Sequence, residues 1–490
     1  MVYFRELQPY SKEDIAARLG ATLDDTSQLI QHLKLHGVIK PVSKSSRLSL
    51  QEDRLESTDD ISSVIEDART CYNFTFVGVV CKSEYVIKVL PKYIPVDDTT
   101  AFDKLRQVLQ VIHKYNSQTQ EVTVATGGEQ NASTNLLDIQ IFLVSDFMEN
   151  GIYTNYKDTL SLDNEGEIDW NHTVNELDPL IINGAPFYTD FYARNSEVDD
   201  GDFFRRLHVC IAADALHELR KQSLDALFSI SAEIDSPGPI ADLGDIPFLL
   251  DRIEKERRVQ FVTRKQMLLQ TMFAYLSHKT MAHSNLTFSF YGTTCFHLIW
   301  EEICKQVFPN FLNKSLSQLD VTLTVAYENR SGETLQNLIS KPVWKMNYKG
   351  ELCNISASKT LIPDIIHIAR IDSGFVFCIL DAKYYDIFDS AKPIKNPPGV
   401  ADILKQYAYQ MAYNSFISEH NFTAVKNAFV FPSDGSSFEI AGEVQMPFFE
   451  HVHTKPDLVT IQVIKVPARH LYACYLQGGI KSIQSIFPDL

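Results

Sequence analysis

Three features are absent from this sequence of 490 residues. It has no run of about 18 or more apolar residues, and its polar start is unlike a signal peptide, so we expect no membrane-spanning helix. It has no Cys-x-x-Cys pair, and most of its eight cysteines lie in apolar runs. This pattern predicts reduced core residues of a cytoplasmic protein rather than disulfides or zinc ligands. It has no Gly-Lys dipeptide, which excludes a phosphate-binding loop of the G-x-x-x-x-G-K-[ST] type.

Positive charge is also scarce, because 45 Lys and Arg face 62 Asp and Glu and the formal net charge is −17. Such a balance argues against a protein that coats nucleic acid non-specifically, although a local basic cleft is compatible with it. Apolar residues make up 45% of the chain, enough to fill several cores. We therefore predict a multidomain protein of the α/β (α+β) class. The expected domains are 1–50, 69–120, a mainly helical middle region at 137–285, and 286–490.

The first fifty residues have the outline of a winged-helix-like module. A helix is expected to begin at Ser11 and end at Gly20, a second to run from about Asp25 to His36, and a short strand to follow Gly37. Basic residues gather near its end, and as DNA-binding candidates we take Lys34, Lys40, Lys44 and Arg47. The alternative is a partner-binding module on which these charges are simply solvated.

Between this module and residue 286 the pattern predicts a hairpin over Tyr72–Ile94 and a helix over Ala101–Tyr115. Residues 153–195 are expected to be irregular. Helical periodicity returns over Asp202–Arg220 and Pro247–His278, the latter with proline in its first turn.

The strongest chemical signal is a second predicted hairpin, over residues 362–383. Two β-rich runs are joined by Asp372-Ser373-Gly374, a turn signal. If the turn has two residues, Ile371 pairs with Gly374, and counting outward places Asp364 opposite Asp381. Opposed residues have Cβ atoms about 4.5–5.5 Å apart. Lys383 then shares a face with Asp381. A longer turn would shift this register by a residue or two.

Two carboxylates so close repel each other unless a cation lies between them. The carboxylates of Asp364 and Asp381 and the main-chain carbonyl of Ala382 are oxygen ligands of the kind that Mg²⁺ prefers, with Mn²⁺ as a substitute. Lys383 could orient a water molecule or stabilise developing charge. The spacing Pro-Asp…Asp-x-Lys thus predicts a PD-(D/E)xK nuclease centre. Among the three Pro-Asp dipeptides, only Pro363-Asp364 is followed by an acid-x-Lys.

Two flanking helices are candidates to complete the centre. Phe296–Val307 is amphipathic, and Glu301 adjoins its apolar stripe, from where it could face the end of the sheet; the alternative is a solvated acid. Ala401–Ser415 carries Gln406, which could contact a phosphate or water, or belong to a solvated polar face.

At these residues the sequence resembles the LlaJI-type restriction endonucleases, which are related to the McrC nuclease subunit of modification-dependent restriction systems. The matching segments are Tyr291-Gly292-Thr293, Trp300-Glu301, Pro363-Asp364, Asp381-Ala382-Lys383 and Gln406-Tyr407-Ala408-Tyr409-Gln410, with Gly166–Thr173 further upstream. The resemblance covers roughly residues 150–440. It implies metal binding by Asp364 and Asp381, completion of the centre by Lys383, and Glu301 as the helix acid. It also implies double-stranded DNA as substrate and a separate AAA+ GTPase motor subunit (McrB-like) as partner. We expect docking within Tyr153–His278.

Two other functions remain open at this point. One is a non-catalytic DNA-binding regulator, which would rest on the N-terminal module alone and leave the last 200 or so residues unexplained. The other is a degenerate nuclease kept as a scaffold, against which the intact Asp364, Asp381 and Lys383 speak.

Overall fold

The structure is a computed structural model that describes residues 2–42, 70–82, 85–125, 135–162, 166–281, 288–349, 351–388, 394–451 and 457–490. The chain forms two compact units, one made of residues 1–130 and 291–490 and the other of residues 131–290. The first unit is therefore discontinuous in sequence. The expected segments 1–50 and 69–120 and most of 286–490 all fall in it, whereas 137–285 falls in the second.

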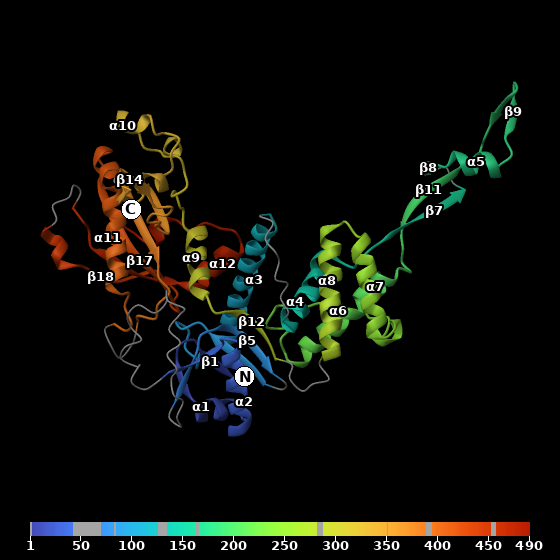
Figure 1. Ribbon diagram of the computed structural model, residues 1–490, viewed down its shortest axis with the longest axis horizontal. Helices are drawn as coiled ribbons and strands as arrows, with labels where there is room; N and C mark the ends of the chain where they lie inside the picture. Colours follow the sequence, from blue (N-terminus) through green and yellow to red (C-terminus); the bar gives the residue numbers. More distant parts are fainter. Residues whose placement is uncertain are drawn as a thin grey trace. The chain divides into compact units, whose positions relative to one another are not determined.

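The N-terminal part of the first unit contains two short helices, α1 (Lys12–Leu19) and α2 (Leu23–Leu35) (Figure 1). Ser11 and Asp14 form a reciprocal capping box at the start of α1, and Gly20 ends it in the left-handed conformation, as the sequence predicts. A small sheet follows in the order β2-β4-β3, made of β2 (Pro9–Ser11), β4 (Cys71–Phe74) and β3 (Ile39–Val42).

A second sheet in this part has the order β1-β6-β5-β12. Its strands are β1 (Tyr3–Arg5), β6 (Tyr85–Leu90), β5 (Val77–Lys82) and β12 (Phe288–Thr293). β5 and β6 pair antiparallel, which confirms the predicted hairpin. Helix α3 (Ala101–Ala125) follows and is longer than the expected Ala101–Tyr115.

The C-terminal part of the first unit is built on a five-stranded mixed sheet in the order β15-β16-β17-β19-β18. The strands are β15 (Ile365–Ile371), β16 (Gly374–Ala382), β17 (Ala424–Ser433), β19 (Ile461–Pro467) and β18 (Glu439–Val444). β16, β17 and β19 run parallel, and each edge strand is antiparallel to its neighbour. The carboxyl ends of the three central strands therefore lie at the same edge of the sheet.

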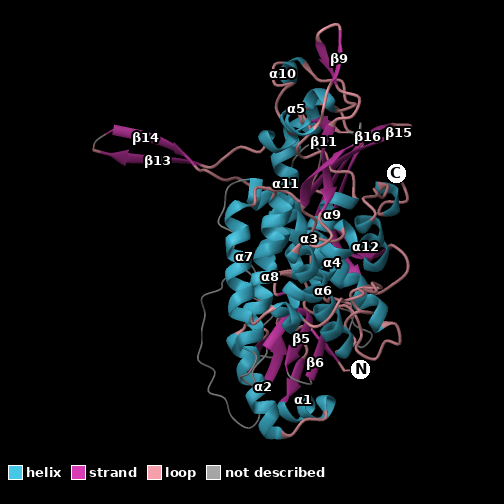
Figure 2. Cartoon of the chain, turned by 90° about the vertical axis from the view of Figure 1, so that its right-hand side faces the viewer, coloured by secondary structure: helices cyan, strands magenta, loops and turns pink. Residues whose placement is uncertain are grey.

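Three helices pack against this sheet: α9 (Phe296–Val307), α11 (Val400–Glu419) and α12 (Ala468–Leu476). Side chains from one face of β15 and β16, such as Ile366 and Phe377, form a buried apolar cluster with Tyr413 and Phe416 of α11. Short 3-10 helices η3 (Leu316–Gln318), η4 (Leu335–Leu338), η5 (Pro447–His451) and η6 (Ile483–Ser485) and helix α10 (Val325–Glu328) complete the periphery. A separate ribbon, β13 (Val343–Tyr348) with β14 (Glu351–Ser356), projects from this part (Figure 2).

The second unit contains helices and, against expectation, several strands. Its helices are α4 (Leu136–Asn150), α5 (Trp170–Glu176), α6 (Phe203–Lys221), η2 (Ile240–Leu243), α7 (Ile246–Val259) and α8 (Thr263–Met281). Its strands are β7 (Tyr156–Leu162), β8 (Glu167–Ile168), β9 (Leu180–Ile182), β10 (Ala185–Phe187) and β11 (Tyr192–Val198). None of the helices in the described ranges is long and apolar enough to span a membrane.

Two expectations for this unit are wrong. Residues 153–195 are not irregular, because β7 pairs with β11 along its whole length. The strands there are hard to recognise because most of their side chains are exposed and polar residues interrupt the apolar positions. The stretch Pro247–His278 is two helices, because the extended backbone of Gln260 ends the first. The Gln260 side chain accepts hydrogen bonds from the main-chain N–H groups of Phe261 and Val262, between the two helices.

A buried polar cluster joins the N-terminal part of the first unit to its large sheet. The hydroxyl of Tyr384 donates a 2.5 Å hydrogen bond to the carboxylate of Glu6, and Lys92 Nζ lies 4.2 Å from the centre of the Tyr384 ring. All three residues are less than 10% exposed. Burial raises the pKa of Glu6, although Lys92 and the Tyr384 hydroxyl oppose this shift. Residues far apart in sequence thus share one desolvated site.

We predict that Tyr384→Phe lowers the melting temperature of the full chain. The change removes a donor from a buried carboxylate, which costs about 2 kcal/mol of the free energy of unfolding. Tyr348→Phe is the matched control, because Tyr348 is 63% exposed. Thermal melts of both variants, followed by circular dichroism, provide the measurement. Equal melting temperatures for the two variants would show that the buried contact does not stabilise the unit.

Candidate active site

The hairpin of β15 and β16 has the register that the sequence predicts. Ile371 pairs with Gly374 across a turn of two residues, and the pairing continues outward to Ile365 and Leu380. Gly374 has φ +138°, and a Cβ there would lie 2.7 Å from Thr423 Oγ1, so glycine is needed at this position. The next position outward in this register places Asp364 opposite Asp381.

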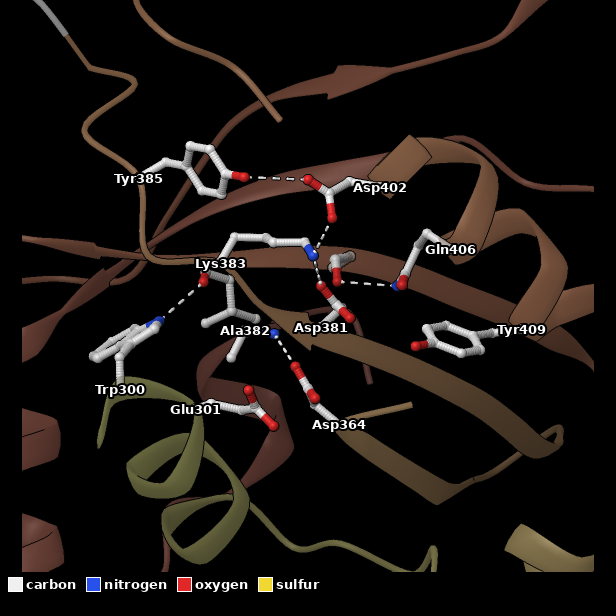
Figure 3. Close-up of polar contacts among 12 residues, drawn as sticks. Trp300, Glu301, Asp364, Asp381, Ala382, Lys383, Tyr385, Asp402, Gln406 and Tyr409 are labelled. Carbon is white, nitrogen blue, oxygen red and sulfur yellow. Dashed lines mark hydrogen bonds and ion pairs between the residues drawn. The ribbon is translucent and has the colours of Figure 1, made fainter. Parts of the chain in front are cut away.

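Both carboxylates face helix α11, because alternate residues of a strand share one face. Asp364 lies two residues before Ile366, and Asp381 lies four residues after Phe377, so each shares a face with that apolar residue. Ile366 and Phe377 both pack in the buried cluster with α11. The main-chain N–H of Ala382 donates a 2.8 Å hydrogen bond to Asp364 Oδ2 (Figure 3). The two strand ends are thereby tied to each other through one of the carboxylates.

The backbone around Asp364 is fixed from both sides. Asn310 Nδ2 donates to the Asp364 carbonyl (2.8 Å), and Asn310 Oδ1 accepts from the N–H of Ile366 (3.2 Å). The hydroxyl of Tyr409 donates to the Ile362 carbonyl at 2.8 Å. Asp364 therefore lies outside the last paired residue of β15 and is nevertheless held in place.

Lys383 lies between two carboxylates. Its Nζ is 2.9 Å from Asp381 Oδ2 and 2.6 Å from Asp402 Oδ1, and Asp402 also accepts a 3.3 Å hydrogen bond from the Tyr385 hydroxyl. Burial disfavours the charged lysine, but Asp381 and Asp402 outweigh this and raise its pKa. Lys383 is therefore a fixed ammonium group at the end of β16.

Asp364 and Asp381 are both poorly solvated, with side chains only 13% and 4% exposed. Burial, then the neighbouring Asp381, then Glu301 raise the pKa of Asp364 to about 7. Burial also raises the pKa of Asp381, although Lys383 acts against it. The two carboxylates together thus hold more negative charge than their surroundings compensate.

Helix α9 brings Glu301 to this edge, as expected. Glu301 forms an ion pair with Lys305 one turn later, and Lys305 Nζ is 3.6 Å from Asp364 Oδ1. The indole N–H of Trp300 donates a weak 3.4 Å hydrogen bond to the Val430 carbonyl on β17, which fixes the helix against the sheet. Glu301 is 33% exposed, and its charge contributes to the raised pKa of Asp364.

Gln406 is fully buried, so the alternative of a solvated polar face is wrong. Its Nε2 donates to Asn427 Oδ1 at 2.6 Å and, more weakly, to the Ala428 carbonyl at 3.4 Å on β17. Its Oε1 has no hydrogen-bond partner among the described residues. The contacts seen here attach α11 to the sheet and involve neither carboxylate of the hairpin.

The donor set fits a hard divalent cation. Asp381 Oδ2 is buried and, among the described residues, accepts no hydrogen bond of good geometry, despite its proximity to Lys383. Two desolvated carboxylates with raised pKa values and a main-chain carbonyl at Ala382 are ligands suited to Mg²⁺. No cluster of three or more His, Cys, Asp or Glu side chains arranged to hold a metal occurs in the described parts of the chain.

The N-terminal DNA-binding candidates are only partly described. Lys40 is exposed on β3 and Lys34 is half-buried near the end of α2, whereas Lys44 and Arg47 lie outside the described residues. In the segment 166–173, Asp169 caps α5 and accepts a 2.8 Å hydrogen bond from Arg194 Nε, and Thr173 Oγ1 accepts from the N–H of Tyr192. These contacts give this segment a packing role in its own unit.

Three residues around the carboxylates were not identified from the sequence. Lys305 follows Glu301 at the i,i+4 spacing of a helical ion pair, a signal that could have been read. Asp402 lies in the first turn of α11, where acids are common for reasons of helix stability. Nothing in the sequence indicates that Asn310 brackets Asp364.

Similarity to known proteins identifies the family of this chain. The family model for the LlaJI restriction endonuclease matches residues 76–468. The chain belongs to this family. It is 28% identical over 443 residues to the "Type II restriction enzyme BsuMI component YdjA" of Bacillus subtilis (strain 168), covering 86% of this chain and 84% of that protein. The resemblance stated from the sequence is therefore correct, and the chain is a member of a restriction nuclease family.

Two solved structures from Thermococcus gammatolerans are also similar. The refined half-complex of McrB AAA+ hexamers with bound McrC matches with a TM-score of 0.35 and 13% identity, covering 97% of this chain and 98% of that chain. The McrBC complex solved by cryo-EM matches with a TM-score of 0.22 and 15% identity, covering 56% and 79%.

We predict a pH-dependent gain of stability for Asp364→Asn in metal-free buffer. A carboxyl whose pKa is raised from about 3.9 when unfolded to about 7 when folded destabilises the fold increasingly as pH rises through this window. The variant removes this charge, so its melting temperature should exceed that of the wild type at pH 8, and the difference should shrink toward pH 5. Thermal melts with a chelator measure it.

Asp372→Asn is the matched control, because Asp372 is an exposed acid in the turn of the same hairpin. It should melt like the wild type at both pH values. A melting-temperature difference between Asp364→Asn and the wild type that does not change with pH would contradict the electrostatic origin of the effect.

Proposed function

We propose that this chain is a Mg²⁺-dependent restriction-type deoxyribonuclease with a PD-(D/E)xK centre formed by Asp364, Asp381 and Lys383. The observation that carries the proposal is the pair of buried carboxylates on facing strand ends, with a lysine of raised pKa beside them. A non-catalytic regulator or a scaffold would leave this costly arrangement without a purpose. Membership of the LlaJI family supports the same activity.

The reaction is hydrolysis of a phosphodiester bond in double-stranded DNA. Water adds its oxygen to phosphorus, the bond from phosphorus to the leaving sugar oxygen breaks, and a proton ends on that oxygen. Mg²⁺, or Mn²⁺ in its place, would be held by Asp364, Asp381 and the Ala382 carbonyl and would supply charge stabilisation and a more acidic water.

The other groups of the chain orient and support this centre. Lys383 directs its ammonium group toward the same edge and stabilises charge that develops on the phosphate. Asp402 holds Lys383 in position through its 2.6 Å contact. Glu301, paired with Lys305, supplies a further carboxylate beside Asp364. Gln406 acts as a positioning residue for α11 in our proposal, through its contacts with β17.

The finer fold assignments belong to the same proposal. The five-stranded mixed sheet with α9 and α11 fits a PD-(D/E)xK nuclease fold, and α1, α2 and the sheet β2-β4-β3 fit a winged-helix-like module. The module presents Lys40 to solvent, and we propose that it contacts DNA. All eight cysteines are free thiols in the structure, which suits a reducing cytoplasm.

We also propose that a separate AAA+ GTPase subunit works with this chain. The support is the missing Gly-Lys dipeptide, which excludes a phosphate-binding loop of this type here, and the naming of the Bacillus relative as one component of a restriction enzyme. Docking would use the unit of residues 131–290. Its hairpin of β9 and β10 is apolar and exposed, with Leu180, Ile181, Ile182 and Phe187 each at least half exposed.

We predict that Asp381→Asn and Lys383→Ala each abolish cleavage of plasmid DNA, with a loss of at least about 100-fold. Metal binding separates the two, because aspartate is a ligand and lysine is not. Calorimetric titration with Mn²⁺ should therefore show lost affinity for Asp381→Asn and retained affinity for Lys383→Ala. Asp372→Asn, in the turn of the same hairpin, should cleave like the wild type. Unchanged cleavage by Asp381→Asn would refute the site.

We predict that the purified chain neither binds nor hydrolyses GTP or ATP, and that adding the proposed AAA+ motor subunit stimulates cleavage. Nucleotide hydrolysis and plasmid cleavage are measured for the chain alone and for the mixture. Replacing Ile181 and Phe187 with Ser should abolish the stimulation and leave folding intact, because both side chains are more than half exposed. Full cleavage by the chain alone, unchanged on mixing, would contradict the partnership.

A further inference from the structure

The ribbon of β13 and β14 has no role in the catalytic centre described above. Its two strands pair over six residues, and every described side chain in them is exposed except the half-buried Cys353. Trp344 and Tyr348 are both 63% exposed. An isolated two-stranded ribbon is marginally stable in water, so one with large exposed side chains calls for a binding partner.

The ribbon is strongly basic although the chain as a whole is acidic. Between residues 341 and 359 the sequence has four lysines and one acid, Glu351, whereas the whole chain has a net charge of −17. All four lysines, Lys341, Lys345, Lys349 and Lys359, are exposed. In the described parts of the chain no carboxylate forms an ion pair with them, while Lys426 and Lys465 of the nearby sheet are each paired with an acid. This local charge is complementary to a polyanion.

The two faces of the ribbon differ. One carries Trp344 beside Ile355 and Met346 beside Cys353, and these cross-strand pairs stabilise the ribbon. The other carries Lys345 beside Asn354 and Asn347 beside Leu352, with Val343 and Ser356 at its base. Lysines and amides are the groups that contact phosphates and base edges, and a two-stranded ribbon is narrow enough to enter the major groove of DNA.

The base of the ribbon is fixed close to the catalytic strand. The N–H of Ala357 donates to the Pro342 carbonyl, and Thr360 Oγ1 donates to the Ser340 carbonyl, both at 2.8 Å. Gln336 then holds the Leu361 carbonyl at 3.1 Å. Only seven residues separate Ser356 from Asp364, a span of at most about 28 Å. The ribbon itself is about 20 Å long at 3.4 Å per residue.

We propose that the β13–β14 ribbon is a DNA-contacting arm, which binds the duplex beside the phosphodiester that the catalytic centre attacks. This inference rests on the proposed nuclease function and extends it to a second contact surface. Lys341, Lys345 and Lys349 neutralise phosphates, and the ribbon enters the adjacent major groove. The arm secures DNA next to Asp364 despite the net negative charge of the chain.

The test is the salt dependence of DNA binding by the full chain. All proteins carry Asp381→Asn, and their affinity for a fluorescent DNA duplex is measured by anisotropy with Mg²⁺ over a range of salt concentrations. The test variant carries Lys341→Gln, Lys345→Gln and Lys349→Gln. Each lost phosphate contact should lower the slope of log affinity against log salt by about 0.9. The slope of the triple variant should therefore fall by about two to three, and the variant should bind at least tenfold more weakly at low salt.

The charge-matched control carries Lys157→Gln, Lys221→Gln and Lys255→Gln, three exposed lysines of the other unit. It should retain the slope of its parent. An equal fall of the slope in this control, or an unchanged slope in the ribbon variant, would contradict the proposal that the ribbon binds DNA. A second copy of the chain is the competing occupant: if Trp344→Ser with Met346→Ser dissociates a dimer while the lysine variant binds DNA normally, the ribbon is a protein interface and the proposal is wrong.

Separate measurements test the DNA-contacting arm and the proposed nuclease centre. Cutting of the duplex by the Asp381→Asn parent, seen on a denaturing gel, would refute the catalytic assignment. Weakened binding by the lysine variant would still place the arm on DNA in that case. Absence of any DNA binding by the parent would overturn both.

Discussion

The repulsion between two desolvated carboxylates is the constraint on which the C-terminal half of the structure depends. Asp364 and Asp381 lie opposite each other at the ends of adjacent strands, where burial and mutual repulsion raise the pKa of Asp364 to about 7. The chain compensates for this only in part. Lys383 lies 2.9 Å from Asp381, Lys305 lies 3.6 Å from Asp364, and one N–H group, that of Ala382, donates to Asp364. The incomplete compensation costs folding stability, and the cation that we propose for this site would offset that cost.

The architecture around this pair holds it rigid. β16 is central in the sheet, so its end is fixed by β15 on one side and by β17 on the other. The Val430 carbonyl accepts two hydrogen bonds, one from the indole N–H of Trp300 and one from the main-chain N–H of Lys383. Gln406 fastens α11 to β17 from the opposite helix layer. The side chains of the proposed centre are thus held by contacts to the sheet.

Local features of this fold could be predicted from the sequence, and long-range ones could not. The turn at Asp372-Ser373 fixes the register of the hairpin, and the capping box at Ser11 fixes the start of α1, because both depend on neighbouring residues. Asn310 beside Asp364 and Asp402 beside Lys383 depend on how distant elements pack, and the sequence has no period or spacing that records this. The strands β7 and β11 were missed because, in a largely exposed ribbon, polar residues interrupt the apolar alternation by which strands are recognised. Likewise, no local pattern indicates that residues 1–130 and 291–490 form one unit.

The contact between Glu6 and Tyr384 has a consequence for how the protein is made. Glu6 and Lys92 leave the ribosome long before Tyr384, since nearly 300 residues separate Lys92 from it and synthesis proceeds at about 5–20 residues per second. For roughly 15–60 s, on this rate, the N-terminal strands have no partner for their buried charges. The unit of residues 131–290, which is continuous in sequence, emerges in this interval. Completion of the first unit is therefore among the last events of synthesis, and a truncated nascent chain lacks the assembled pair of Asp364 and Asp381.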